Sequence, residues 1–439
     1  AVLHARFDTA LDDFKAPGLG RDHPQWIGGQ AAEGGERFEV RSPIDQDWVG
    51  GRFVQGSPAD VDRAVQAART AYPAWAATPW RERVALLRRA ARLIEERVYA
   101  ISAAVAVEVG KNRMEAIGEV QETADLIDWY CDQMESHDGF DRPLADDPLP
   151  NFASHNRSVL RPYGVWAVIA PFNFPFALAG GPLGPALIAG NTAVFKCSPE
   201  TSLSGWLLLE CLRDAGLPPG VINFVTGGDD TGRALAQHPA VAGITFTGSH
   251  AVGMQVLRQA MQGPYPKPCI TEMGGKNATI VSRHGDVERA ALGILRSAFG
   301  LSGQKCSACS RVYVERPAAP ALRERLVQLT RDIAVGDPTQ QAHWMGPVID
   351  RRAYERYARL AQHLRSVGQI DTGGEWLTGG DLARGFFVAP TVARAPLQDA
   401  AWVDEHFLPV VLVGEVDSVD EGIDRANASD YGLTAGFYG

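Results

Sequence analysis

The stretch YGVWAVIAPFNFPFALAGGPLGPALIAGNTAVFK (residues 163–196) joins an apolar strand, a Gly/Ala-rich helix and a second apolar strand. The alternation continues, with strands expected over 163–170, 192–196, 221–225 and 243–247 and helices over 176–190, 201–214, 230–237 and 249–262. This pattern predicts an α/β fold with right-handed crossovers and a parallel sheet covered by helices on both faces. Because such sheets bind ligands at the carboxyl ends of their strands, the loops there are candidate site segments.

Outward from this core, a second α/β unit is expected to begin near residue 274. Its expected helices cover 286–300, 317–333, 351–367 and 418–427, and its expected strands cover 311–314, 386–392 and 410–416. Towards the N-terminus, residues 2–15 place apolar side chains on one helical face, and residues 38–42 and 48–54 predict a hairpin. Helices are expected to open at Ser57-Pro58 and Thr78-Pro79, to stop at Gly110, and to cover 113–136. The Pro- and Asp-rich residues 137–156 predict a connection or an arm.

Composition narrows the classes of function. The 439 residues predict two or three domains, and the net charge of −10 argues against nucleic acid or an anionic membrane as a partner. The sequence has no run of eighteen apolar residues, so no membrane span is predicted, and the acidic residues near the N-terminus do not fit a signal peptide. The six cysteines form no disulfide framework, which indicates a reducing cytoplasm. The histidines show no ligand spacing, so no metal site is expected.

Residues 303–311 read GQKCSACSR and place Cys306 between a predicted helix and a predicted strand. Gly303 and Ser302 would allow the close backbone approach that a presented thiol needs. Lys305 would favour the thiolate, the form that attacks a carbonyl carbon. From these residues alone a Cys306–Cys309 redox pair, half a zinc site or a buried packing cysteine are equally open.

Four other places carry polar or glycine signals at predicted strand ends. Phe246 to Gly253 includes Gly248 and Ser249 at a helix start, and Gly228 and Gly232 repeat this device one unit earlier, which together predict a phosphate cradle. Neither is the G-x-G-x-x-G fingerprint, and ordinary helix starts remain an alternative. The other three signals are single residues, and each has a structural alternative. Lys196 could contact a ribose or be a snorkelling lysine, and Asn173 could donate to an oxyanion or be a turn residue. Glu272 could be a general base or a local hydrogen-bond acceptor.

Taken in order, these segments resemble the aldehyde dehydrogenase superfamily. The resemblance runs through Pro171 to Pro175, Lys196, Phe246 to Gly253, Glu272 to Lys276, Gly303 to Cys306, Glu405 to Pro409 and Tyr431 to Thr434. The stretch around Cys306 is similar to the branch that oxidises L-glutamate γ-semialdehyde, the 1-pyrroline-5-carboxylate dehydrogenases.

The resemblance implies a mechanism. Cys306 would attack the aldehyde to form a thiohemiacetal, and the Asn173 amide with the Cys306 backbone N–H would hold the oxyanion. Hydride would pass to the nicotinamide of NAD, with NADP as the alternative, and Glu272 would activate the water that hydrolyses the thioester. Lys196 and Glu405 would bind the riboses, Phe407 would flank the nicotinamide, Ser249 would meet the pyrophosphate, and Ser307 and Lys305 would anchor a substrate carboxylate.

The resemblance also implies a domain plan. Residues 1–137 and 161–273 would bind the cofactor in a Rossmann-like domain, 138–160 would begin a small β bridging arm of a homo-oligomer (dimer or higher), and 274–439 would form the catalytic domain. Family chains continue for several tens of residues past the equivalent of Gly439, so the C-terminal end of that domain is expected to be missing here.

Two departures from the family pattern leave points open. Lys196 is followed by Cys197-Ser198-Pro199-Glu200 where the family has Pro-Ser-Glu, so the carboxylate that disfavours a 2′-phosphate is shifted or missing. Leu408 replaces the usual glycine of the Glu405 motif. The alternatives are a dehydrogenase for another aliphatic or aromatic aldehyde, a non-catalytic homologue, and a Cys306–Cys309 dithiol protein.

Overall fold

Five adjacent parallel strands make up most of a seven-stranded sheet in this computed structural model, which describes residues 2–439. The strand order is β12-β11-β8-β9-β10-β2-β3, and only β2 and β3 run antiparallel to their neighbours. The bounds are β2 Gln25–Ile27, β3 Gln30–Ala32, β8 Val165–Ile169, β9 Thr192–Lys196, β10 Ile222–Val225, β11 Val241–Thr247 and β12 Cys269–Glu272. The predicted parallel sheet is therefore confirmed.

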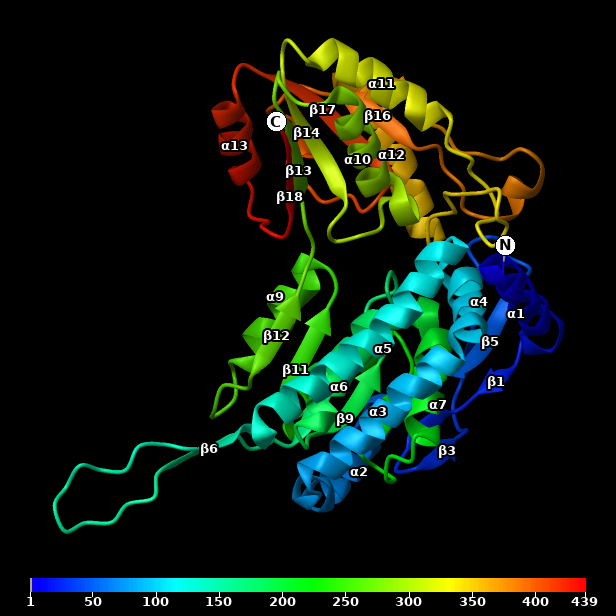
Figure 1. Cartoon of the computed structure of the whole chain (residues 1–439). Coiled ribbons are helices and arrows are strands. Elements are labelled where there is room, and N and C mark those ends of the chain that lie inside the picture. Colours follow the sequence, from blue (N-terminus) through cyan, green and yellow to red (C-terminus); the bar gives the residue numbers. More distant parts are fainter. Residues whose placement is uncertain (1) are drawn as a thin grey trace.

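Both faces of this sheet are covered, because its strands are apolar on both sides. In β8, Val165 and Ala167 pack in the cluster of the face covered by α2, α8 and α9, whereas Trp166 and Val168 pack in the opposite cluster with α6 and α7. Helices α3, α4 and α5 add a further layer outside α6 and α7, with α1 against α4 (Figure 1). The bounds are α1 Val2–Gly18, α2 Pro58–Ala77, α3 Trp80–Glu96, α4 Val98–Val109, α5 Arg113–Ser136, α6 Ala177–Ile188, α7 Ser202–Asp214, α8 Asp229–Gln237 and α9 His250–Ala260.

The strand order reverses between β8 and β11. The chain builds β8, β9 and β10 in one direction and then returns to place β11 on the other side of β8. The loops after β8 and β11 therefore diverge and leave a crevice between them, which is where open α/β sheets bind ligands.

A second, six-stranded sheet has the order β15-β16-β17-β14-β13-β18, parallel except for β15. Helices α10 and α11 cover one face and α12 and α13 the other. The bounds are β13 Asn277–Val281, β14 Cys309–Glu315, β15 Gln369–Thr372, β16 Thr391–Arg394, β17 Val410–Val416, β18 Ala435–Tyr438, α10 Val287–Phe299, α11 Ala319–Arg331, α12 Arg351–Val367 and α13 Val419–Asn427. The link between β12 and β13 joins the two α/β bodies, so it holds Glu272 and Gly274 at their junction (Figure 1).

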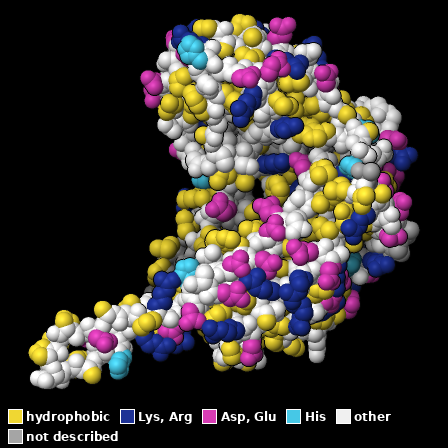
Figure 2. Space-filling view, in the orientation of Figure 1, with side chains coloured by type: hydrophobic (Ala, Val, Ile, Leu, Met, Phe, Trp, Pro, Cys, Tyr) yellow, Lys and Arg dark blue, Asp and Glu magenta, His cyan; other side chains and the backbone are white. Residues whose placement is uncertain are grey.

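Two small sheets complete the chain. Strands β1 (Asp22–His23), β5 (Val49–Val54) and β4 (Arg37–Arg41) form one, and β4 and β5 make the predicted hairpin. Strands β6 (Asp141–Pro143) and β7 (Arg157–Val159) form an antiparallel ribbon that projects from the body. Its apolar side chains are exposed, as Figure 2 shows along the protruding segment, and they include Leu144, Leu149, Phe152 and Leu160.

Two sequence predictions differ from the structure. The strand expected over 386–392 begins only at Thr391, because Pro390 has no N–H to donate to a ladder. Thr78 does not cap α3, whose N-cap is Pro79; the Thr78 hydroxyl instead donates to Ala74 O at 3.0 Å. The short strand β15 was not predicted. Among residues 2–439 no helix has the length and apolar character needed to cross a membrane.

Candidate active site

A cleft of about 850 Å³ opens at the carboxyl ends of the parallel strands, between the two α/β bodies. All but three of the predicted site residues line it; the exceptions are Glu272, Ser307 and Lys305. The predicted residues in its wall are Asn173, Lys196, Gly228, Gly232, Gly248, Ser249, Cys306, Glu405 and Phe407. The fold thus brings together residues from both sides of the switch point and from the second body.

Cys306 is half-buried in the cleft wall and follows a strained turn. Leu301, Ser302 and Gly303 all take positive φ angles of 47°, 54° and 70°, a conformation that costs about 1–3 kcal/mol for a residue with a side chain. A Cβ on Gly303 would lie 2.2 Å from Leu408 O, so glycine is required there. The predicted close backbone approach is confirmed.

The environment of Cys306 favours the neutral thiol at rest. Burial raises the pKa of the Cys306 thiol, and the negative charges of Glu405 and Glu272 raise it further, against a backbone hydrogen bond from Ser307. The expectation that Lys305 favours the thiolate is wrong, because its ammonium donates instead to Glu115 Oε1 at 2.8 Å. Deprotonation of Cys306 therefore requires a base.

Asn173 lies in the loop that follows β8, and its side chain is buried. Its Nδ2 donates to Gln304 O at 3.0 Å, two residues before the thiol. An amide NH₂ has two hydrogens, so one remains for an acceptor in the cleft. This contact holds a donor next to Cys306, as an oxyanion site requires.

A buried ion pair contacts the loop that contains Asn173 and stabilises it. Lys111 donates to Glu119 Oε2, and neither side chain is exposed to solvent. Glu119 Oε1 accepts from the N–H of Phe176 at 2.8 Å, and the Lys111 ammonium lies 3.6 Å from the centroid of the Phe174 ring. Burial lowers the pKa of Lys111, and the Glu119 carboxylate opposes that change. The pair thus fixes the loop and the start of α6 together.

Glu272 ends β12, and its backbone carbonyl accepts from the Gly248 N–H at 3.0 Å. Its side chain is exposed, and its charge acts on the Cys306 thiol. A solvated carboxylate near the thiol can exchange protons with water.

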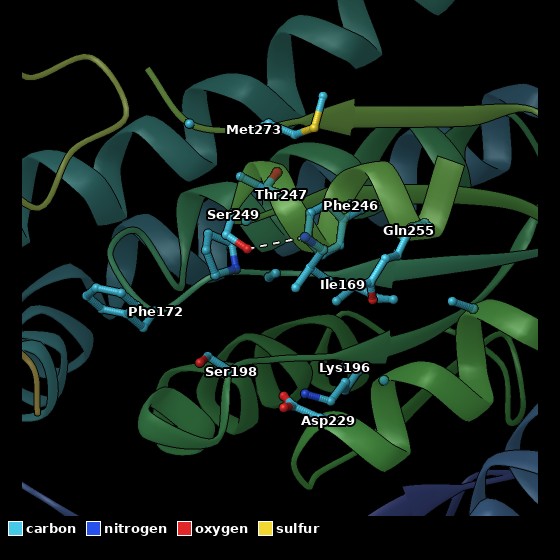
Figure 3. Close-up of a pocket in the computed structure, with 18 of the residues that line it drawn as sticks. Ile169, Phe172, Lys196, Ser198, Asp229, Phe246, Thr247, Ser249, Gln255 and Met273 are labelled. Atoms are coloured by element: carbon cyan, nitrogen blue, oxygen red, sulfur yellow. Dashed lines mark hydrogen bonds between the residues drawn. The ribbon is translucent and has the colours of Figure 1, made fainter. Parts of the chain in front are cut away.

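At the other end of the cleft, Lys196 closes β9 and donates from Nζ to Cys197 O at 3.0 Å. Burial lowers the pKa of Lys196. Figure 3 shows Lys196, Ser198 and Asp229 together on one wall, opposite Phe246, Ser249 and Met273. A Cβ on Gly232 would lie 3.5 Å from Lys196 Cε, an ordinary van der Waals distance, so this glycine lies directly beside the lysine stem.

Two helices point their N-termini into the same cleft. Gly228 is the N-cap of α8 and Ser249 that of α9, and Ser249 Oγ accepts from the Val252 N–H at 3.4 Å (Figure 3, dashed line). Free N–H groups and the helix dipole favour a phosphate at such positions.

Glu405 and Phe407 close the cleft near Cys306. Glu405 Oε1 accepts from the Gly275 N–H at 2.8 Å, and a Cβ on Gly274 would lie 2.0 Å from Glu405 Oε2. Burial raises the pKa of Glu405. Phe407 has φ of 57°, and its ring packs edge-on at 5.9 Å from the ring of Phe172.

Ser307 and Lys305 lie outside the large cleft. Ser307 is exposed and lines a smaller cavity of about 280 Å³ beside β13 and β18. The Lys305–Glu115 pair is about one fifth exposed. Cys309 is buried with its thiol 3.2 Å from Thr279 Oγ1.

The cleft also contains residues that the sequence analysis did not assign. Arg356 of α12 lines it and donates from Nε to His406 O at 3.0 Å, and Asp229 lines it from the first turn of α8. No motif marked Arg356, whereas a charged residue next to Gly228 was a visible signal for Asp229.

A thiol, a positioned amide and a carboxylate at the switch point of a parallel sheet define an α/β enzyme that acts on a small molecule. The sequence profile of the aldehyde dehydrogenase family matches residues 30–439. The chain therefore belongs to the aldehyde dehydrogenase family, and it is an aldehyde-oxidising enzyme.

Several known proteins are similar to this chain in sequence or in structure. The chain is 37% identical over 424 residues to a 1-pyrroline-5-carboxylate dehydrogenase of Geobacillus kaustophilus, with 95% of this chain and 80% of the relative covered. It is 36% identical over 437 residues to one of Staphylococcus epidermidis, with 98% and 82% covered. A Thermus 1-pyrroline-5-carboxylate dehydrogenase structure with bound NAD matches with a TM-score of 0.93 and 32% identity, covering 99% of this chain and 83% of that one.

Proposed function

We propose that the enzyme oxidises L-glutamate γ-semialdehyde to L-glutamate through a thioester on Cys306, with NAD as hydride acceptor. The observation that carries the proposal is the position of the Cys306 thiol in the cleft wall, two residues after the carbonyl that holds the Asn173 amide. The resemblance to several 1-pyrroline-5-carboxylate dehydrogenases supports the substrate.

The residues of the cleft fit a nicotinamide dinucleotide. The cleft volume of about 850 Å³ lies in the range of cofactor sites, and glycines at two helix N-termini leave room for a pyrophosphate. Lys196 would contact the adenosine ribose, Ser249 the pyrophosphate, Glu405 the second ribose and Phe407 the nicotinamide. When bound, the cofactor supplies a hydride acceptor beside Cys306. The Thermus relative with bound NAD supports NAD as that cofactor.

The chain's own groups account for the other steps. Because the Cys306 thiol is neutral at rest, Glu272 takes its proton as sulfur attacks the aldehyde carbon. The free Asn173 amide hydrogen and the Cys306 N–H hold the oxyanion. Glu272, which is exposed, then passes the thiol proton to solvent. After hydride loss, the Glu272 carboxylate removes a proton from the water that attacks the thioester, which releases the carboxylate product and the Cys306 thiol.

The substrate would extend from Cys306 towards Lys305 and Ser307. The Lys305–Glu115 pair offers one cation and one anion at 2.8 Å, partly open to solvent. That pair matches the carboxylate and ammonium of an amino-acid zwitterion, and the Ser307 hydroxyl adds a donor for the carboxylate.

The same proposal assigns roles to the larger parts. Residues 1–137 and 161–273 would hold the cofactor, 274–439 would carry the nucleophile, and the ribbon of 138–160 would join copies of the chain in a homo-oligomer. Exposed Leu149 and Phe152 on an isolated two-stranded ribbon support that last role. Free and mostly buried cysteines support a reducing, cytoplasmic setting.

Formation of reduced cofactor at 340 nm tests the proposal. The semialdehyde is expected to be a better substrate than propanal or benzaldehyde, which lack both charges, by about 100-fold in kcat/KM, as for a site with paired polar groups. Cys306→Ala should abolish turnover, and Cys309→Ala, the matched control, should retain most of it. Full activity in Cys306→Ala would refute the mechanism, and equal use of benzaldehyde would refute the substrate.

A further inference from the structure

We propose that Asp229 is the residue that makes this enzyme select NAD over NADP. This inference rests on the proposed function, in which the adenosine ribose lies against Lys196. The sequence analysis left the cofactor choice open, because the carboxylate expected shortly after Lys196 is shifted or missing.

Asp229 is the carboxylate at the Lys196 end of the cleft. Among residues 2–439, the acidic side chains that line the cleft are Asp229 and Glu405, and Glu405 lies at the Cys306 end on the Gly275 N–H. Figure 3 shows the Asp229 carboxylate beside the Lys196 ammonium, and its charge acts on the pKa of Lys196. The Asp229 side chain is exposed to the cleft and, among residues 2–439, makes no hydrogen bond to another side chain.

Glu200, the carboxylate nearest to Lys196 in sequence, is directed elsewhere. It accepts from Ser198 Oγ and pairs with Arg352 Nη2 at 3.2 Å, and it does not line the cleft. The shift of one position relative to the family motif therefore leaves the Glu200 carboxylate outside the cleft wall, although its charge, like that of Asp229, still acts on the pKa of Lys196. Asp229 supplies a negative charge from the neighbouring loop after β10, and its charge acts on both Lys196 and Arg352.

Two arginines near this end are paired with carboxylates. Arg233 pairs with Asp230 at 3.0 Å, and Arg352 pairs with Asp350 at 2.9 Å in addition to Glu200. Among residues 2–439, Lys196, Arg258 and Arg356 line the cleft without a salt bridge to a carboxylate, and it is Lys196 that lies beside Asp229. A ribose 2′-hydroxyl can donate a hydrogen bond to the Asp229 carboxylate, whereas a 2′-phosphate would bring up to two negative charges against it.

An acidic residue in the first turn of a helix also stabilises the helix dipole, so the test must separate the two roles. Asp420 provides the control, because it lies in the first turn of α13, is exposed, and does not line the cleft. Asp230 is unsuitable, because its loss would free Arg233, which lines the cleft. Asp229→Asn and Asp420→Asn each remove one charge from the first turn of a helix, but only Asp229→Asn removes it from the ribose site.

The experiment measures kcat/KM for NAD and NADP with the full enzyme, together with calorimetric binding of 5′-AMP and adenosine 2′,5′-bisphosphate. In Asp229→Asn the NADP/NAD ratio of kcat/KM should rise about tenfold, as expected for loss of one repulsive charge at close range, and binding of the bisphosphate should tighten in parallel. Asp420→Asn should change the ratio less than about twofold, since its charge is exposed and lies outside the cleft.

The outcomes are distinct. A wild-type enzyme that uses NADP as well as NAD, an unchanged ratio in Asp229→Asn, or an equal change in both variants would overturn the assignment. Failure of the wild-type enzyme to bind 5′-AMP or to use either cofactor would instead overturn the proposed function on which it rests.

Discussion

Replacement of Glu119 by Gln tests whether the buried pair with Lys111 holds the loop of Asn173. The amide of Gln can still accept from the Phe176 N–H, but it leaves the Lys111 ammonium without an anion in a site with no solvent. Removal of one partner of a buried pair costs about 3–5 kcal/mol, since the remaining charge is uncompensated.

The same change should slow catalysis. Glu119 fixes the first N–H groups of α6, three residues after Asn173, so its loss displaces the amide donor. A displacement of about 1 Å at a reacting centre costs up to about 100-fold, so we expect kcat to fall by about 10- to 100-fold. The KM for NAD should change little, because Lys196 and Ser249 lie on other loops.

Urea unfolding followed by tryptophan fluorescence, together with kcat, measures both effects. Glu115→Gln is the control for stability alone. Glu115 lies on the same helix as Glu119, and loss of its partly exposed pair with Lys305 should cost about 1 kcal/mol or less. The double variant Lys111→Met/Glu119→Gln removes both charges and should recover about half of the lost stability. If Glu119→Gln costs no more than Glu115→Gln, the reasoning fails.

Three further changes have defined outcomes. Gly303→Ala should lose at least about 3 kcal/mol and most activity, because its Cβ would meet Leu408 O at 2.2 Å; wild-type melting would contradict this. Burial raises the pKa of Glu108 to about 7 from an ordinary 4.5, so the fold holds this proton more tightly than the unfolded chain. The contribution of the Glu108 proton to the free energy of unfolding is fully present below pH 4.5 and is lost as the pH rises through 7. The urea midpoint of Glu108→Gln should lack this decrease with rising pH. Glu272→Gln should give one burst of reduced cofactor at 340 nm and then stall as a thioester, and unchanged steady-state turnover would exclude Glu272 as the base.

The sequence predicted the parts of the fold that depend on local pattern. Apolar runs such as Thr192–Lys196 form strands because both faces are buried, and turn residues marked their ends. Where Pro390 interrupts an apolar run, the run alone predicted a strand that the missing N–H forbids.

Contacts between distant residues could not be predicted in the same way. Lys305 lies next to Cys306 in sequence, but its partner Glu115 is 190 residues away, and only the fold shows that the Lys305 ammonium is paired there. Arg356 enters the cleft from a helix without a motif. Asp229 was visible as an acidic residue beside a glycine, but its proximity to Lys196 depends on the pairing of β9 with β10.

The left-handed turn before Cys306 has a consequence for when the enzyme becomes reactive. Ser302 Oγ donates to Gly346 O at 2.7 Å, and Gly303 lies against Leu408 O, so segments made much later in synthesis hold the turn in place. A nascent or partly melted chain lacks both supports and carries only an ordinary, flexible cysteine. Aldehydes are electrophiles that modify proteins indiscriminately, and the thiol that we propose captures them takes up its position in the cleft only after folding has reached residue 408.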